Sequence, residues 1–168
     1  DCGAHDPAIE SLTRLLEDPL PERQRVLTHL QLAEALLWSG DAPRALRQAL
    51  AVIQSSPGSQ EGSAARVVAA LCLADETDLE PDAVERLLLQ AGQPGADNAL
   101  DEAWSRRAAL ARLIRSSHDP AHAAEVAHAV AEPLASLPPG KFLARQLSQL
   151  ANRGVNAAQR LNPSGNQQ

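Results

Sequence analysis

The sequence predicts an all-α fold built from pairs of short antiparallel helices. Ala and Leu dominate its 168 residues, aromatic side chains make up 2% of them, and Tyr and Met are absent. This composition favours helix over strand. Apolar residues also recur at three- and four-residue steps, and Asp-Pro, Gly and Pro signals interrupt them at intervals. A chain of this length can form one domain with a core of its own, without a metal or a disulfide.

The first two helices have clear start and stop signals. Asp6 and Pro7 begin the first helix, because Asp caps free N–H groups and Pro fits the first helical position. The segment Asp18–Pro21 ends it. The second helix is predicted over about Glu22–Trp38, with Gly40 as its left-handed C-terminal cap.

The next helices follow the same logic. Asp41 caps a third helix, which ends at Ser55–Gly58, and a fourth is predicted over about Ser63–Ala74. An acidic connection leads to a fifth helix that begins at Glu80–Asp82. The stretch Gln90–Asn98 carries Gly and Pro and is predicted to be a loop.

The last helices are predicted from the same kinds of signal. One extends from about Ala99 to Ser117, and the next begins at Asp119–Pro120 and ends near Pro133. A C-terminal helix is predicted over about Lys141–Leu161. The tail Asn162–Gln168 lacks apolar residues and is predicted to be disordered.

The chain contains an internal repeat. Shifting Leu32–Gln54 forward by 78 positions places it on Leu110–Glu132. Leu36 then meets Ile114, a conservative change. The identical pairs lie at expected packing and capping positions: Leu32/Leu110, Ala33/Ala111, Asp41/Asp119, Ala45/Ala123, Ala49/Ala127, Ala51/Ala129 and Val52/Val130.

In this repeat the chain resembles the tetratricopeptide repeat (TPR) family, whose unit is a helix–turn–helix of about 34 residues. The positions that carry the resemblance are Leu32, Ala33, Leu36, Gly40, Ala45, Ala49, Val52 and Pro57. The second copy departs from the pattern, because His118 replaces Gly40 and no Pro ends it.

The resemblance implies a short right-handed α-solenoid of antiparallel helix pairs with a C-terminal capping helix. Residues 1–161 would form a single TPR-like domain, followed by the tail 162–168. Its units would be a good repeat at about 26–59, a distorted repeat at about 60–98, a fair repeat at about 99–135 and the capping helix at about 141–161.

The resemblance also implies a concave groove, lined by the first helix of each pair, that binds a segment of a partner protein. The groove residues would be Leu27, Leu30, Glu34, Leu37 and Trp38 at an apolar end, and Arg112 and Arg115 at a cationic end. Such a groove suits a segment with hydrophobic and acidic residues. The alternative is a purely structural subunit, whose groove is filled by the first or the C-terminal helix.

Charge and motifs argue against other classes of function. The net charge is −6 and the pI about 5.3, so nucleic acid is not expected as a partner. No apolar run reaches the length of a transmembrane span, about 20 residues. Phosphate-binding loops, nucleophile elbows and Cys–His pairs are missing from the sequence. We therefore expect neither an enzyme nor a cofactor.

Two clusters of possible metal ligands are read as solvated surface. His118, His122 and His128 cluster with Asp119 and Glu125, but His122, Glu125 and His128 recur at three-residue steps, which drift around a helix instead of sharing a face. The acidic run Asp75–Asp82 lacks the Gly and the final Glu of a calcium loop. A helical metal protein or enzyme built on the histidines is the least favoured function.

The two cysteines leave three alternatives open. Cys2 and Cys72 are two unpaired thiols, or they form a disulfide in an oxidising compartment, or Cys2 is a bacterial lipid anchor. A membrane is a partner in the last case alone. The high Arg and Ala content suggests a bacterial source. The periplasm or another extracytoplasmic compartment is favoured, with the cytoplasm as the alternative, and the partner is expected to be a protein or peptide.

Overall fold

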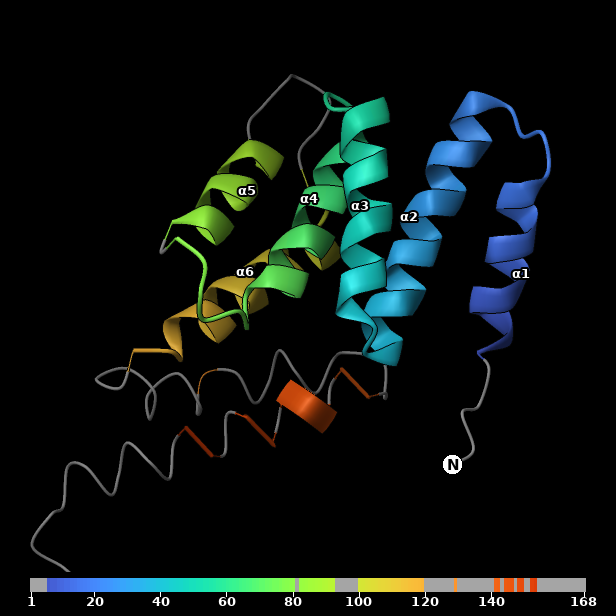
Figure 1. The fold of residues 1–168 in the computed structure, drawn as a ribbon. Helices are drawn as coiled ribbons and strands as arrows, with labels where there is room; N and C mark the ends of the chain where they lie inside the picture. Colours follow the sequence, from blue (N-terminus) through green and yellow to red (C-terminus); the bar gives the residue numbers. More distant parts are fainter. Residues whose placement is uncertain are drawn as a thin grey trace, which may run out of the picture.

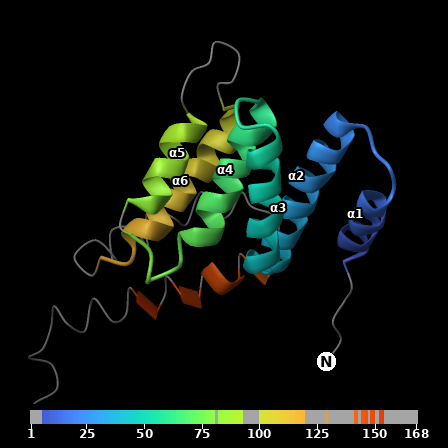
Figure 2. The same cartoon turned by 45° about the horizontal axis from the view of Figure 1, so that its top comes forward.

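The helices follow one another across the molecule in chain order. The computed structural model describes residues 6–80, 82–92, 100–119, 129, 141–142, 144–146, 148–149 and 152–153. Within these ranges the secondary structure is helical and no strand occurs. Figures 1 and 2 show α1 to α5 side by side, with α6 against α4 and α5. The helices are α1 (Pro7–Glu17), α2 (Glu22–Ser39), α3 (Ala42–Ser55), α4 (Gln60–Leu73), α5 (Ala83–Ala91) and α6 (Glu102–Ser116).

Side-chain caps define most helix starts. Asp6, Asp41 and Asp101 accept hydrogen bonds from backbone N–H groups in the first turns of α1, α3 and α6. Ser59 does the same for α4, which therefore begins three residues earlier than Ser63. The predicted boundaries of the first three helices agree with the structure to within a residue or two.

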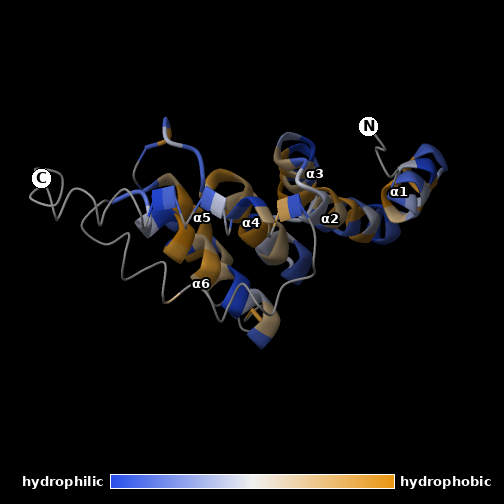
Figure 3. Cartoon of the chain, turned by 90° about the horizontal axis from the view of Figure 1, so that it is seen from below, coloured by the Kyte–Doolittle hydropathy of each residue, from blue (hydrophilic) through white to orange (hydrophobic). Residues whose placement is uncertain are grey.

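Adjacent helices pack as pairs, with α4 at the centre. Helix α4 contacts α2, α3, α5 and α6, and its residues from Gly62 to Cys72 are buried except for Arg66, which is half-buried. Gly62 lets the start of α4 lie close to the end of α3, because a Cβ there would be 2.1 Å from the carbonyl oxygen of Ser56. Seen from below, hydrophobic residues colour the sides on which α4, α5 and α6 meet (Figure 3).

The core depends on alanine. Ala33, Ala45, Ala49, Ala65 and Ala70 are completely buried. Small side chains at these positions let the helix axes approach each other and leave Leu and Val to fill the remaining space.

The first helices of the two repeat copies, α2 and α6, bury the same equivalent positions. Leu32 and Leu110, Ala33 and Ala111, and Leu36 and Ile114 are all buried. The helix pairing and the all-α class are therefore confirmed. The second half of the copy, residues 120–132, lies almost entirely outside the described residues, as does the predicted tail. No described helix is long and apolar enough to cross a membrane.

Candidate binding surface

One stripe of α2 remains accessible beside α6. Leu27, Gln31, Glu34 and Trp38 are spaced by three or four residues and share one side of the helix. Leu27 is 37% exposed, whereas Glu34 and Trp38 are half-buried. With Trp104 and Arg107 of α6, these residues form what we call the inner-helix surface.

Arg107 connects the two helices of this surface. Its guanidinium donates to the Glu34 carboxylate over 2.8 Å, and the two side chains are 22% and 25% exposed. The same guanidinium lies 5.3 Å from the ring centre of Trp38 and 4.4 Å from that of Trp104. Cation–π contacts of this kind contribute from about 0.5 to 2 kcal/mol each. The surface therefore has a fixed arrangement before any partner arrives.

The structure separates the seven predicted groove residues into three groups. Leu27, Glu34 and Trp38 lie on the inner-helix surface. Leu30 and Leu37 belong to the core and have almost no exposed area, so neither is available to a partner in this structure.

Arg112 and Arg115 point to another part of the molecule. Arg112 makes a two-pronged ion pair with Glu85 of α5, over 2.9 and 3.1 Å. Arg115 donates to the backbone carbonyls of Glu76 and Leu79, in the connection between α4 and α5. Both arginines thus hold α6 against α5 and the connection that precedes it. They are not brought together with Leu27 and Trp38.

The C-terminal segment contacts the carboxyl ends of α2, α4 and α6, which we call the inner helices. We call its described residues, 141–142, 144–146, 148–149 and 152–153, the strap. Phe142 meets Trp38 edge-on with ring centres 5.4 Å apart. A Cβ on Gly40 would lie 3.1 Å from the Lys141 Cβ, so the strap rests on the turn after α2. Arg153, eleven residues after Phe142, donates to the Ser117 hydroxyl at the end of α6.

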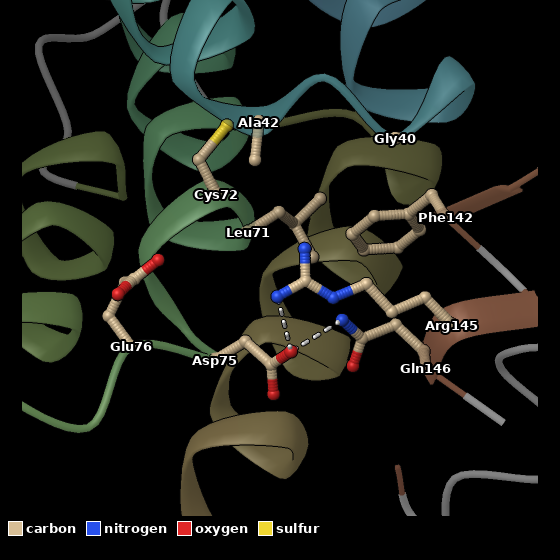
Figure 4. A pocket seen from close by; sticks show the side chains of 9 residues that line it. All are labelled: Gly40, Ala42, Leu71, Cys72, Asp75, Glu76, Phe142, Arg145 and Gln146. Atoms are coloured by element: carbon tan, nitrogen blue, oxygen red, sulfur yellow. Dashed lines mark hydrogen bonds and ion pairs between the residues drawn. The ribbon is translucent and has the colours of Figure 1, made fainter. Parts of the chain in front are cut away.

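Asp75, just after α4, is the centre of the polar contacts to the strap. Its side chain is 7% exposed and lies 2.7 Å from Arg153 and 3.6 Å from Arg145. It also accepts a 3.3 Å hydrogen bond from Gln146 (Figure 4). The carboxyl ends of α2, α4 and α6 all face the strap, and their partial negative charge favours its arginines.

The surroundings of Asp75 leave little free space. A small recess of about 20 Å³ remains between Gly40, Leu71, Phe142 and Gln146. That volume admits about one water and no organic ligand. The prediction of a solvated acidic run is therefore wrong for Asp75, whose carboxylate is buried against cations, while Glu76, Asp78, Glu80 and Asp82 are exposed.

His118 borders the same network. Its Nε2 lies 3.8 Å from Asp75. Burial lowers the pKa of His118, and the charge of Arg153 adds to this against the opposing effect of Asp75. The described residues contain no group of three or more potential metal ligands. His122, Glu125 and His128 lie outside the described ranges.

Cys72 is a free, buried thiol. Burial raises its pKa to about 12, so the thiol stays protonated and unreactive at neutral pH. Cys2 lies outside the described residues, and its lipidation stays a prediction.

Sequence reasoning missed the residues that organise this region: Arg107, Trp104, Asp75 and Phe142. A signal existed for one pair, since Trp104 and Arg107 are three residues apart and share a helix face. Asp75 and Phe142 gave no local signal, because their partners are distant in sequence.

Searches against known protein families, curated proteins and solved structures gave no match for this chain.

Proposed function

We propose that this chain is a non-catalytic, TPR-like scaffold, a short right-handed solenoid that binds a segment of a partner protein on the inner-helix surface. The observation that carries the proposal is an exposed leucine, Leu27, on the same stripe of α2 as half-buried Trp38, whose ring lies beside Arg107. Tryptophan and arginine are enriched among the few residues that carry most of the binding energy of protein interfaces.

The chemistry of the surface suggests the chemistry of the segment. An apolar side chain would cover Leu27, and a hydrogen-bonding group would reach Gln31. An acidic residue would compete with Glu34 for Arg107, whose ion pair stays partly exposed. This restates the predicted hydrophobic and acidic segment with Arg107, in place of Arg112 and Arg115, as its cationic anchor.

The experiment compares two exposed leucines. Leu27→Arg removes the apolar contact of the surface, whereas Leu50→Arg makes the same change on α3, at a leucine that is 43% exposed. Each tagged variant is used to capture proteins from a lysate of the source organism, with quantification by mass spectrometry. We expect a protein that wild type and Leu50→Arg retain and that Leu27→Arg loses at least tenfold. Equal capture by all three would contradict the proposal.

A structural subunit with a self-filled surface is the second candidate. It is supported by Phe142, which covers Trp38, and by the Glu34–Arg107 pair, which bridges α2 and α6. Leu27 then serves no partner, and wild type and Leu27→Arg should capture the same proteins.

The extracytoplasmic setting in a bacterium, as an accessory to an assembly or secretion system, rests on composition and on Cys2. The intact mass of the protein purified from its source would distinguish a free Cys2 from a lipidated one.

A further inference from the structure

We propose that the strap is an intramolecular ligand, seated in a docking site for a partner helix that presents an aromatic residue and two arginines on one face. The proposal rests on the proposed scaffold function and adds a second site to it, at the carboxyl ends of the inner helices. The strap closes this site until a segment of the same chemistry displaces it.

The strap has the pattern of a helical recognition motif. Arg145, Gln146 and Arg153 follow Phe142 by three, four and eleven residues, which places all four on one face of a helix. The distance from Phe142 to Arg153 along the axis is about 16 Å, roughly two helix-to-helix spacings. One segment can thus reach the ends of α2, α4 and α6 in turn.

The receiving site is complementary to that motif. Trp38 and Leu71 flank the Phe142 ring, and Gly40 keeps the turn beside it free of a side chain. The Asp75 carboxylate, 7% exposed, receives both arginines and the glutamine. Ser117 accepts from the far arginine. These groups come from three helices or the residues just after them, and together they meet the aromatic, the glutamine and both arginines of the motif.

The strap fits this site imperfectly. The amide oxygens Gln146 Oε1 and Gln149 Oε1 are buried without a hydrogen-bond partner. A buried polar atom without a partner lowers the stability of the contact. Of the strap residues whose burial is described, Phe142 and Gln146 alone are fully buried. A partner helix that keeps the aromatic, the arginines and the donor to Asp75, but leaves no buried oxygen without a partner, would bind more tightly than the strap.

The test uses the full-length protein and a synthetic peptide of residues 139–161 with a fluorescent label. Phe142→Ala in the protein loosens its own strap and frees the site. We expect the peptide to bind this variant at least tenfold more tightly than wild type. Asp75→Asn added to Phe142→Ala should abolish that binding, and a peptide with Phe142→Ala and Arg153→Ala should not bind either protein.

Two further measurements keep the outcome unambiguous. Arg153→Ala in the protein is a second way to loosen the strap, and it should also increase peptide binding if Phe142→Ala impairs folding. Size-exclusion chromatography over a range of concentrations detects exchange of straps between two copies. The proposal would be overturned if neither variant bound the peptide saturably, or if Asp75→Asn left binding unchanged. A dimer that forms without peptide binding would overturn it as well.

The two proposals fail in different ways. Leu27 is about three turns from Trp38 along α2, so Leu27→Arg should leave peptide binding unchanged. Loss of partner capture in Leu27→Arg together with absent peptide binding would retain the scaffold function and reject the docking site. The opposite pair of results would reject the inner-helix surface alone.

Discussion

Helices α2 and α6 share buried positions in their middle turns and differ at their ends. Their equivalent positions, 78 residues apart, are buried in parallel: Leu32 with Leu110 and Leu36 with Ile114. At the next inward position α2 has Leu37 in the core, whereas α6 has Arg115, which binds two backbone carbonyls. The repeat therefore preserves helix packing, while its ends have been adapted to different neighbours.

The turns after the two helices show the same divergence. Gly40 has a φ of +89° and ends α2 with a left-handed cap, and α3 begins two residues later. His118 stands at the equivalent position after α6, and no described residue other than Gly40 has a positive φ. The tight reversal after α2 is thus not repeated after α6, where the side chain of His118 meets the Asp75 network instead.

The largest effect is expected from the shared packing positions. Leu36→Ala and Ile114→Ala each remove a fully buried side chain and should lower the free energy of unfolding by about 2–5 kcal/mol. Urea denaturation followed by circular dichroism measures both. A loss below about 1 kcal/mol at either site would show that the two helices are not packed alike.

Gly40 and His118 test the difference between the turns. Gly40→Ala strains a left-handed residue and pushes against Lys141, so we expect a loss of about 1–3 kcal/mol. His118→Gly should bring no compensating gain, because that turn uses no positive φ. Thermal unfolding of the two variants gives the answer, and a stabilising His118→Gly would contradict the assignment of the second turn.

The arginines of α6 differ in burial and so in expected effect. Arg107→Ala removes a half-buried ion pair and two aromatic contacts and should cost about 1–2 kcal/mol of stability. Arg112→Ala removes an exposed pair with Glu85 and should cost less than about 1 kcal/mol. Chemical denaturation compares them directly, and an equal loss would mean that Arg107 does not couple α6 to α2.

The smallest effect is a dependence on pH. The pKa of His118 is lowered in the folded state, so the unfolded chain binds the proton more readily. The contribution of His118 is fully present above its ordinary pKa of about 6.5 and decreases as the pH falls toward the folded pKa. Stability measured from pH 7.5 to pH 5 should thus fall more steeply for wild type than for His118→Gln. Parallel curves would exclude this role.

The sequence was sufficient to predict the helices, but not the contacts between residues that are far apart in the sequence. Asp6, Asp41 and Gly40 mark helix ends through hydrogen bonds and φ values that depend on neighbouring residues. The burial of Leu30 and Leu37 was harder to foresee, because a helical stripe shows which residues share a side and not how far the next helix covers it. Arg107 illustrates the limit, since its partner Glu34 is 73 residues away.

Cys72 can report how often the strap separates from the end of α4. The thiol lies in the same recess as Phe142 and Gln146 of the strap and is protonated at neutral pH. An alkylating reagent can attack it when the neighbouring segments separate and a thiolate forms in water. In a Cys2→Ser background, the rate at which Cys72 is alkylated therefore measures how often the end of α4 is uncovered.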